Sequence, residues 1–395
     1  MSFEIALSGI NAINTQLDTI SNNIANSGTY GFKSSRANFA SMYAGTQPTG
    51  TEVSSLTQTL GIGGGVLNTG RDLDVSITGG GFFVTRDTNG TEVYTRVGVF
   101  AKDKDGYLVD SFGRKVQGYA AVEGSDALGA MGNLQIPTGQ IPAQASTTLD
   151  YVGNLSVDWT VPTVATFDPA DPQSFNSSVL SVVHDSLGVK HTVTQYFVKT
   201  DTNEITAYYT FDGGAPVGSE VLTFNTEGRL QTPTAAVTVN LGTPTGAEAM
   251  TLAVDYTGTT QYGGDATTTT NAANGYAAGT QSGVQIDADG SVLATYSNGE
   301  KLKVGTIALA TFPNQDALVA VSDTSWTTSN ASGLPLYSAP GVGLAGSLTA
   351  GALEQSNVDM TSELVTLMSA QRNYQANTKV ISTENEMMQT LMQAL

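Results

Sequence analysis

An unbroken seven-residue repeat at the end of the chain limits the possible folds most. Large side chains recur at every seventh position in the series Met360, Leu367, Tyr374, Ile381, Met388 and Leu395. A second series, offset by four residues, is apolar only at its ends: Leu364, Gln371, Thr378, Asn385 and Met392. No glycine or proline interrupts this stretch. The pattern predicts a helix of about 36 residues, or ~55 Å, whose coiled-coil-like seam needs a partner helix.

The start of the chain supplies the matching helix. Its apolar residues follow a three-or-four spacing, with one slip, at Phe3, Leu7, Ile10, Ile13, Leu17, Ile20 and Ile24. Ser2 is a candidate N-cap, and Gly28 is a candidate for the left-handed residue that ends the helix. Cap candidates for the C-terminal helix lie between Ser356 and Asp359. Because neither helix can bury its seam alone, we expect the two termini to pack together.

The residues between the helices have a β pattern. The segments 73–109 and 283–312 alternate apolar with polar residues and contain the hairpin signals Asn89-Gly90, Asp105-Gly106, Asp289-Gly290 and Asn298-Gly299. Charged residues make up only 13% of the sequence, about half the ~25% typical of soluble domains, and glycine and threonine are abundant. The sequence therefore predicts a mostly β protein with terminal α-helices.

Composition changes in the middle of the chain and indicates an inserted domain. Residues 146–280 are rich in threonine, contain three early prolines and end in a low-complexity run. Three basic and 13 acidic residues give this segment a net charge of −10. We therefore predict discontinuous, nested domains. Their bounds are 1–28 plus 357–395 for a coiled-coil-like helical domain, 29–71 for a connecting segment, 72–145 plus 281–356 for a β domain, and 146–280 for an outer β domain.

Charge and hydropathy exclude several partners. The net charge of −19 argues against nucleic acid, which requires a basic surface. The chain has no run of 18 apolar residues, so no membrane insertion is expected, and Glu4 stands where a signal peptide carries basic residues. Export without a cleaved signal peptide is the expectation. The absence of cysteine excludes disulfides and thiol chemistry.

Catalytic and cofactor motifs are not found. The clusters 63–65 and 79–81 are Gly-Gly-Gly runs without the Lys-Ser/Thr of a phosphate-binding loop, and the two D-x-D-G turns lack the distal Glu of a calcium loop. His184 and His191, with Asp185, are the only residues that suggest a metal-dependent hydrolase. Two histidines are too few for a site without further donors. We predict no enzymatic activity, no cofactor and no metal site.

Three segments together resemble the bacterial flagellar axial family of rod, hook and hook-associated proteins. Residues 25–36, ANSGTYGFKSSR, are similar to the family motif that follows the N-terminal helix. Residues 77–119 resemble its central β signature, and residues 353–391 resemble its C-terminal helix. The positions that match the family motifs are Ala25, Asn26, Thr29, Gly31, Phe32, Lys33, Gln371, Arg372, Tyr374 and Gln375.

The resemblance implies a structural role in a tubular helical polymer. A single inserted domain in a chain of 395 residues favours the hook class over shorter rod proteins and a longer junction protein. The implied role is a flexible universal joint outside the cell that transmits torque from rod to filament. The implied partners are copies of the same chain, the rod protein below, a hook-capping scaffold during assembly, the hook-filament junction protein above, and the flagellar type III export apparatus.

Two alternatives stay open from sequence alone. A distal rod or hook-filament junction protein of the same family would share the terminal helices and differ in the insert. A secreted β-rich adhesin would explain the acidic, threonine-rich body but not the helices.

The sequence also suggests roles for individual residues. The residues expected to mediate assembly through the inner helices are Leu7, Ile10, Ile13, Leu17, Ile20, Ile24, Leu364, Leu367, Gln371, Tyr374, Ile381 and Met388. In the segment after the first helix, we expect Phe32 and Phe39 to point inward. Lys33 and Arg36 are expected to face acidic surfaces of neighbouring subunits.

Overall fold

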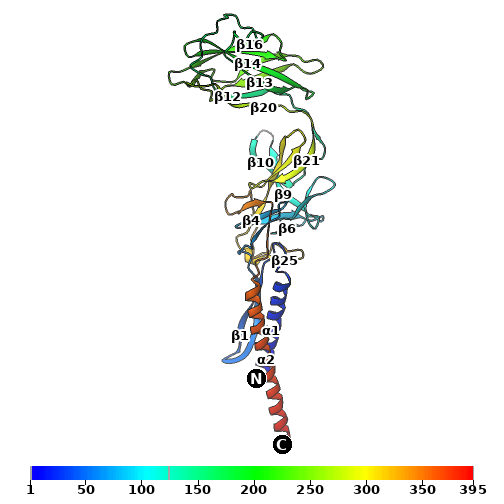
Figure 1. The fold of residues 1–395 in the computed structure, drawn as a ribbon. Coiled ribbons are helices and arrows are strands. Elements are labelled where there is room, and N and C mark those ends of the chain that lie inside the picture. Colours follow the sequence, from blue (N-terminus) through cyan, green and yellow to red (C-terminus); the bar gives the residue numbers. More distant parts are fainter. Residues whose placement is uncertain (1, 123–124, 395) are drawn as a thin grey trace. The chain divides into compact units, whose positions relative to one another are not determined.

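The computed structural model describes residues 2–122 and 125–394, which form one long helix at each end of the sequence and mostly β structure between them (Figure 1). The predicted fold class is confirmed. The chain forms two compact units: unit 1 comprises Met1–Thr138, Gly283–Thr295 and Lys301–Leu395, and unit 2 comprises Gly139–Ser282 and Tyr296–Glu300. The finer division into four parts stays a prediction. Among the described residues, no helix has the length and apolar character needed to cross a membrane.

The two helices of unit 1 are α1 (Ser2–Ala25) and α2 (Met360–Ala394), and they lie side by side as predicted (Figure 1). Helix α2 begins after Asp359, whose Oδ1 accepts hydrogen bonds from the backbone N–H groups of Thr361 at 2.9 Å and Ser362 at 3.4 Å. This N-cap satisfies two of the four free donors of the first turn. The predicted cap by Ser2 involves a side chain outside the described part of the chain.

A long antiparallel hairpin, β1 (Ser35–Ala44) with β2 (Gln47–Gln58), follows α1 and packs along it (Figure 1). Gly45, with φ of +64°, occupies the turn. Bulges interrupt the register at Asn38/Phe39 and Met42/Tyr43. From the sequence, this region was expected to be a connecting segment, and its strands were not predicted.

The main sheet of unit 1 is built from short antiparallel strands around a core that includes Phe82, Tyr94 and Trp326. Each predicted turn glycine in 73–109 and 283–312 adopts a positive φ, between +82° and +91°. The strands in sheet order are β22 (Ser291–Tyr296), β23 (Lys301–Ile307), β9 (Lys115–Val122), β5 (Phe82–Arg86), β6 (Glu92–Thr95), β26 (Ser325–Thr327) and β25 (Val319–Val321). Strands that pair beside this path are β7 (Phe100–Lys102), β8 (Leu108–Asp110), β10 (Ser125–Asn133), β24 (Leu309–Thr311) and β27 (Leu336–Ser338).

Two small ribbons bring the chain from this sheet back towards the helices. Strand β28 (Ser347–Ala350) pairs with β4 (Val75–Thr78), and β29 (Ala352–Glu354) pairs with β3 (Val66–Asn68). A short 3₁₀ helix, η1 (Gln315–Ala317), precedes β25. The ribbon β29–β3 therefore holds the last residues before α2 next to the segment that follows the hairpin.

Unit 2 contains two sheets and its own core. The five-stranded sheet has the order β13 (Ser177–His184), β14 (Lys190–Asp201), β15 (Glu204–Phe211), β16 (Pro216–Phe224) and β17 (Leu230–Thr232). The four-stranded sheet has the order β18 (Val237–Gly242), β19 (Met250–Asp255), β12 (Thr148–Asn154) and β20 (Thr267–Ala273). Strand β11 (Gln140–Ile141) pairs with the first residues of β21 (Gly279–Ile286), which begin the large sheet order β11-β21-β22 and belong to unit 2 only as far as Ser282.

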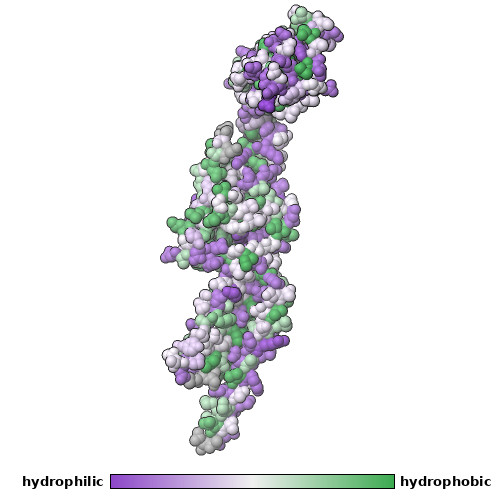
Figure 2. All heavy atoms as spheres, turned by 90° about the vertical axis from the view of Figure 1, so that its left-hand side faces the viewer, coloured by the Kyte–Doolittle hydropathy of each residue, from purple (hydrophilic) through white to green (hydrophobic). Residues whose placement is uncertain are grey.

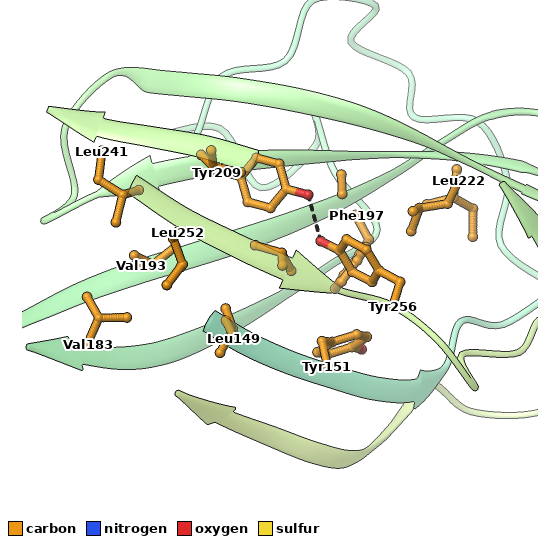
Figure 3. Close-up of a cluster of buried hydrophobic side chains, with 14 of the residues drawn as sticks. Leu149, Tyr151, Val183, Val193, Phe197, Tyr209, Leu222, Leu241, Leu252 and Tyr256 are labelled. Atoms are coloured by element: carbon orange, nitrogen blue, oxygen red, sulfur yellow. Dashed lines mark hydrogen bonds between the residues drawn. The ribbon is translucent and has the colours of Figure 1, made fainter. Parts of the chain in front are cut away.

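The core of unit 2 lies between these two sheets and is mostly apolar, with one polar pair at its centre (Figure 3). The hydroxyl groups of Tyr209 and Tyr256 are 2.9 Å apart, and Tyr256 donates to Oε1 of Gln195 at 2.6 Å. All three side chains are fully buried, so these hydrogen bonds satisfy groups that water cannot reach. Unit 2 thus has the apolar interior of an independent domain.

Candidate functional site: the terminal helices and their junction

The helix pair is held by a small apolar seam. Ile13 and Ile20 of α1 and Ala370 of α2 are buried in one cluster, and Leu17, Ile24 and Leu367 pack against it. Nearer the start of α1, the side chain of Asn377 lies against Gly9, where a Cβ would come within 3.0 Å of its Nδ2 atom. Small residues at this crossing therefore let the two helices approach closely.

The seam that α2 forms with α1 contains only part of the predicted heptad positions. Leu367 contacts α1 as predicted, and Ile381 is partly buried. Ala370 and Asn377 also face α1, and each lies one residue before a polar position of the second heptad series, Gln371 or Thr378. Leu364 and Gln371 are exposed in the single chain. Helix α2 is therefore rotated so that its small residues face α1, and the role of Leu364 and Gln371 in assembly stays a prediction.

Much apolar surface of both helices has no partner within the chain. Leu7 is 43% exposed and Met392 is 74% exposed, although large apolar side chains are normally covered. On the face shown in Figure 2, apolar residues reach the surface of the helical part of unit 1. We call the exposed apolar residues of the two helices the uncovered stripe: Phe3, Ile5, Leu7, Met360, Leu364, Val365, Met368, Tyr374, Val380, Met387, Met388, Leu391 and Met392.

The end of α1 is fixed by Asn23, which is almost fully buried. Its Oδ1 accepts a hydrogen bond from the backbone N–H of Ser35 at 2.9 Å. Its Nδ2 donates to the Ser35 carbonyl at 2.8 Å and to Oε1 of Glu363 on α2 at 2.9 Å. The side-chain amide of Asn23 thus links α1 by hydrogen bonds to the first residue of the hairpin and to the first turn of α2.

The family-motif residues after Ala25 form a series of turns. Asn26 Nδ2 donates to Oδ1 of Asn22 at 2.9 Å, and the Thr29 hydroxyl donates to Oδ1 of Asn26 at 3.1 Å. Gly28 does not adopt a positive φ, so its predicted left-handed role is wrong. That conformation belongs to Gly31, with φ of +67°, which lies so close to the chain at Arg96 that a Cβ would be 2.9 Å from the Arg96 carbonyl carbon.

A buried ion cluster lies immediately beyond this turn. Lys33 Nζ is 2.6 Å from Oε1 of Glu354, and Arg96 Nη1 is 3.2 Å from Oε2 of the same carboxylate. The three side chains are at most 2% exposed. Burial lowers the pKa of Lys33 below its usual 10.5, and the hydrogen bond and charge of Glu354 oppose this shift. Burial likewise lowers the pKa of Arg96.

These contacts correct two predictions about the segment after α1. Lys33 does not face neighbouring subunits, because its ammonium group is enclosed by Glu354 and the Ile62 carbonyl, which it contacts at 2.7 Å. Phe39 does not point inward, because it is 44% exposed. Phe32 is partly buried, as predicted, and Arg36 is exposed with its Nε bonded to Asn38.

Asn357 fixes the segment that leads from β29 into α2. Its Oδ1 accepts a hydrogen bond from the Ser34 N–H at 2.7 Å, and its Nδ2 donates to the carbonyls of Thr59 and Ile62, both at 3.1 Å. The backbone N–H of Asn357 also reaches the Phe32 carbonyl at 3.3 Å. The segment that follows α1 and the segment that precedes α2 are therefore joined by hydrogen bonds.

Sequence reasoning missed Asn23, Arg96, Glu354 and Asn357. Each is a polar residue whose partner lies far away in the sequence, up to 340 residues for Asn23 and Glu363. The scarcity of charged residues was a signal that could have identified Glu354. This residue stands alone in an uncharged stretch, and a buried carboxylate needs a basic partner.

The histidines do not converge on a metal site. His191 lies between two turns of unit 2, with Nδ1 2.7 Å from Oδ2 of Asp212 and Nε2 3.4 Å from Oδ2 of Asp185. These carboxylates raise the pKa of His191 above its usual 6.5 against the opposing effect of burial. Within residues 2–122 and 125–394, no group of three or more potential ligands is arranged to hold a metal ion.

Comparison with known proteins identifies the family of the whole chain. Four family models match: Flagella basal body rod protein at 3–33, Flagellar hook protein FlgE/F/G D1 domain at 76–157, Flagellar basal body protein FlaE D2 domain at 154–276, and Flagellar basal body rod FlgEFG protein C-terminal at 349–394. The D2 model covers most of unit 2, and the two terminal models cover α1 and α2.

Curated relatives match over almost their full length. Flagellar hook protein FlgE of Salmonella typhimurium is 40% identical, with 99% of each chain covered, and that of Escherichia coli is 38% identical, with the same coverage. FlgE of Brucella abortus is 32% identical over 98% of this chain and 96% of that protein. The crystal structure of Helicobacter pylori FlgE2 shares the fold, with a TM-score of 0.53 and 14% identity over 73% of this chain and 100% of that one. The chain therefore belongs to the flagellar hook protein FlgE family, whose members are structural hook subunits and not enzymes.

Proposed function

We propose that this chain polymerises with copies of itself into the tubular hook and acts there as a flexible universal joint that passes motor torque from rod to filament. The main support for this proposal is the uncovered stripe on α1 and α2. Monomeric soluble proteins rarely expose large contiguous apolar patches, and such patches commonly mark protein–protein contacts. A helix pair with apolar residues on its outer faces is suited to packing against identical pairs.

The stripe also suits a polymer more than a closed dimer. Apolar residues occur along α2 from Met360 to Met392, which includes the part beyond the contact with Gly9. Head-to-tail association through such a face produces helical filaments when the rotation between copies does not close a ring. The predicted assembly residues Leu7, Tyr374 and Met388 belong to this stripe.

We assign the remaining segments by their composition. The acidic segment 146–280, with a net charge of −10, is the outer domain of the polymer, where charge aids solubility. Residues 72–145 and 281–356 form the contacts that slide as the joint bends. Few charges and many small residues suit contacts that change partners easily, because such contacts lack large anchoring side chains.

The proposed partners are those implied by the hook role: the rod protein, the hook-capping scaffold, the hook-filament junction protein and the flagellar export apparatus. The match over 99% of the length of two hook relatives supports the hook over a rod or junction position. The proposed location is the cell surface, reached without a cleaved signal peptide.

Immunogold electron microscopy of intact cells tests this assignment. An antibody against residues 146–280 is expected to label a short curved segment at the base of each filament. Label elsewhere on the flagellum, or label that appears only after the envelope is breached, would move the protein to a junction or rod position. Label spread over the cell body would contradict any axial role.

A further inference from the structure

Glu354 makes more contacts than a single ion pair requires. Its Oε1 accepts hydrogen bonds from Lys33 Nζ at 2.6 Å and from the Gly64 N–H at 3.0 Å. Its Oε2 accepts from Arg96 at 3.2 Å, and its backbone carbonyl accepts from the Gly31 N–H at 2.8 Å. One buried residue therefore contacts three separate segments of the chain.

These segments are the connections between the helices and the main sheet. Lys33 follows α1, Gly64 follows the hairpin, and Glu354 is the last residue of β29 before α2. Arg96 directly follows β6 of the main sheet, and its Nη2 donates to the Gly79 carbonyl at 2.8 Å. Force that enters the sheet along either helix must therefore pass through residues bonded to this carboxylate.

We infer that Glu354, with Lys33 and Arg96, is the force-transmitting node through which the terminal helices are mechanically coupled to the β sheet of unit 1. The inference deepens the proposed function, because it rests on the helices carrying torque in the hook. Lys33 and Arg96 are positioning residues: they hold the Glu354 carboxylate, which in turn holds the segments on either side.

The composition of the node favours a mechanical role over a simple contribution to stability. A buried ion pair is costly to desolvate, and apolar residues of similar volume often stabilise a fold equally well. Charge-assisted hydrogen bonds are directional, however, and the Glu354 carboxylate accepts three of them from different directions. Such bonds resist displacement of the segments relative to one another.

Single-molecule pulling on the purified full-length chain separates the two roles. Because the protein has no cysteine, pairs of introduced cysteines give unique handles. Handles at Gly28 and Thr88 place the node in the force path, and both positions are exposed. Handles at Thr88 and Lys301 load the sheet alone. The test variants are Lys33→Met and Glu354→Gln, and Glu354→Gln keeps an oxygen acceptor for Gly64.

Arg114→Met is the matched control, because it breaks another buried ion pair of unit 1, between Arg114 Nε and Asp110 Oδ2 at 2.7 Å. Each test variant is expected to raise the rupture rate at constant force about 100-fold for the Gly28–Thr88 handles, as the loss of one partner of a buried pair implies. The Thr88–Lys301 rate stays unchanged. Arg114→Met affects only the Thr88–Lys301 rate.

Two results would overturn the inference. Equal acceleration for both handle pairs would make the node a general stabiliser, and no acceleration for the Gly28–Thr88 handles would remove it from the force path. If Lys33→Met does not fold, Glu354→Gln decides the question alone, with near-ultraviolet circular dichroism as the check on folding. Because the measurement uses single chains, it is independent of the immunogold test of the hook assignment.

Discussion

Replacement of Asn23 by alanine tests how the helix pair is attached to the rest of unit 1. The side chain is 1% exposed and makes three hydrogen bonds, two to the backbone of Ser35 and one to Glu363. Alanine removes all three and leaves the N–H and carbonyl of Ser35 and one carboxylate oxygen without this partner. The helices themselves keep every apolar contact of the seam.

The size of the effect follows from these bonds. Each neutral bond to Ser35 contributes about 1 kcal/mol, and the bond to the Glu363 carboxylate contributes about 1.5–3 kcal/mol. Ser35 and Glu363 are only partly buried, so water replaces some of the lost bonds. We therefore expect a net loss of about 2–3 kcal/mol in the free energy of unfolding of the helix pair.

Urea unfolding followed by circular dichroism at 222 nm measures this loss, because α1 and α2 are the only α-helices among the described residues. Asn14→Ala is the matched control: Asn14 is exposed on the same helix, and this change brings the same gain in helix propensity. Coincident curves for Asn23→Ala and Asn14→Ala would refute the reasoning, because water would then replace the three bonds at no cost.

Three further predictions concern other parts of the chain. Ile20→Ala should destabilise the helix pair by about 2–4 kcal/mol, whereas Leu7→Ala, at an exposed position, should cost less than about 1 kcal/mol in the same urea assay. Gly31→Ala should disrupt the junction, seen as faster hydrogen exchange in residues 29–34, because Gly31 has a positive φ and no room for a Cβ; Gly28→Ala, with open space, should not. For unit 2, the raised pKa of His191 means that its stabilising effect is complete below pH 6.5 and is lost as the pH rises through the folded-state pKa. His191→Gln should abolish that decline in stability in urea titrations between pH 6 and 9. If the stability of this variant declines as in the parent protein, other groups cause the decline.

The helices and the turns were predictable because each depends on local sequence. The seven-residue repeat and the lack of glycine and proline predicted α2, and the glycines of Asn-Gly and Asp-Gly pairs predicted hairpin turns that the structure contains. The rotation of α2 was not predictable from its own residues. It depends on Gly9 of α1, which admits Asn377 and so favours the side of α2 that carries Ala370.

The junction depends on contacts that no local pattern records. Lys33 is followed by polar residues, and a surface position was the simplest interpretation of an isolated charge. Its burial depends on Glu354, which lies 321 residues away. The hairpin β1–β2 was missed because it lacks an Asn-Gly or Asp-Gly turn, although Gly45 at its tip adopts the same left-handed conformation.

In the polymer, we expect neighbouring copies to pack over the uncovered stripe on α1 and α2. Thiol labelling of Met368→Cys, a 51% exposed position in the otherwise cysteine-free chain, measures this directly. Rates of reaction with a maleimide are compared for the monomer, the purified polymer and the urea-denatured chain. We expect fast labelling of the monomer, close to the denatured rate, and strong protection in the polymer. A polymer that forms normally and whose introduced thiol reacts as fast as in the monomer would contradict it.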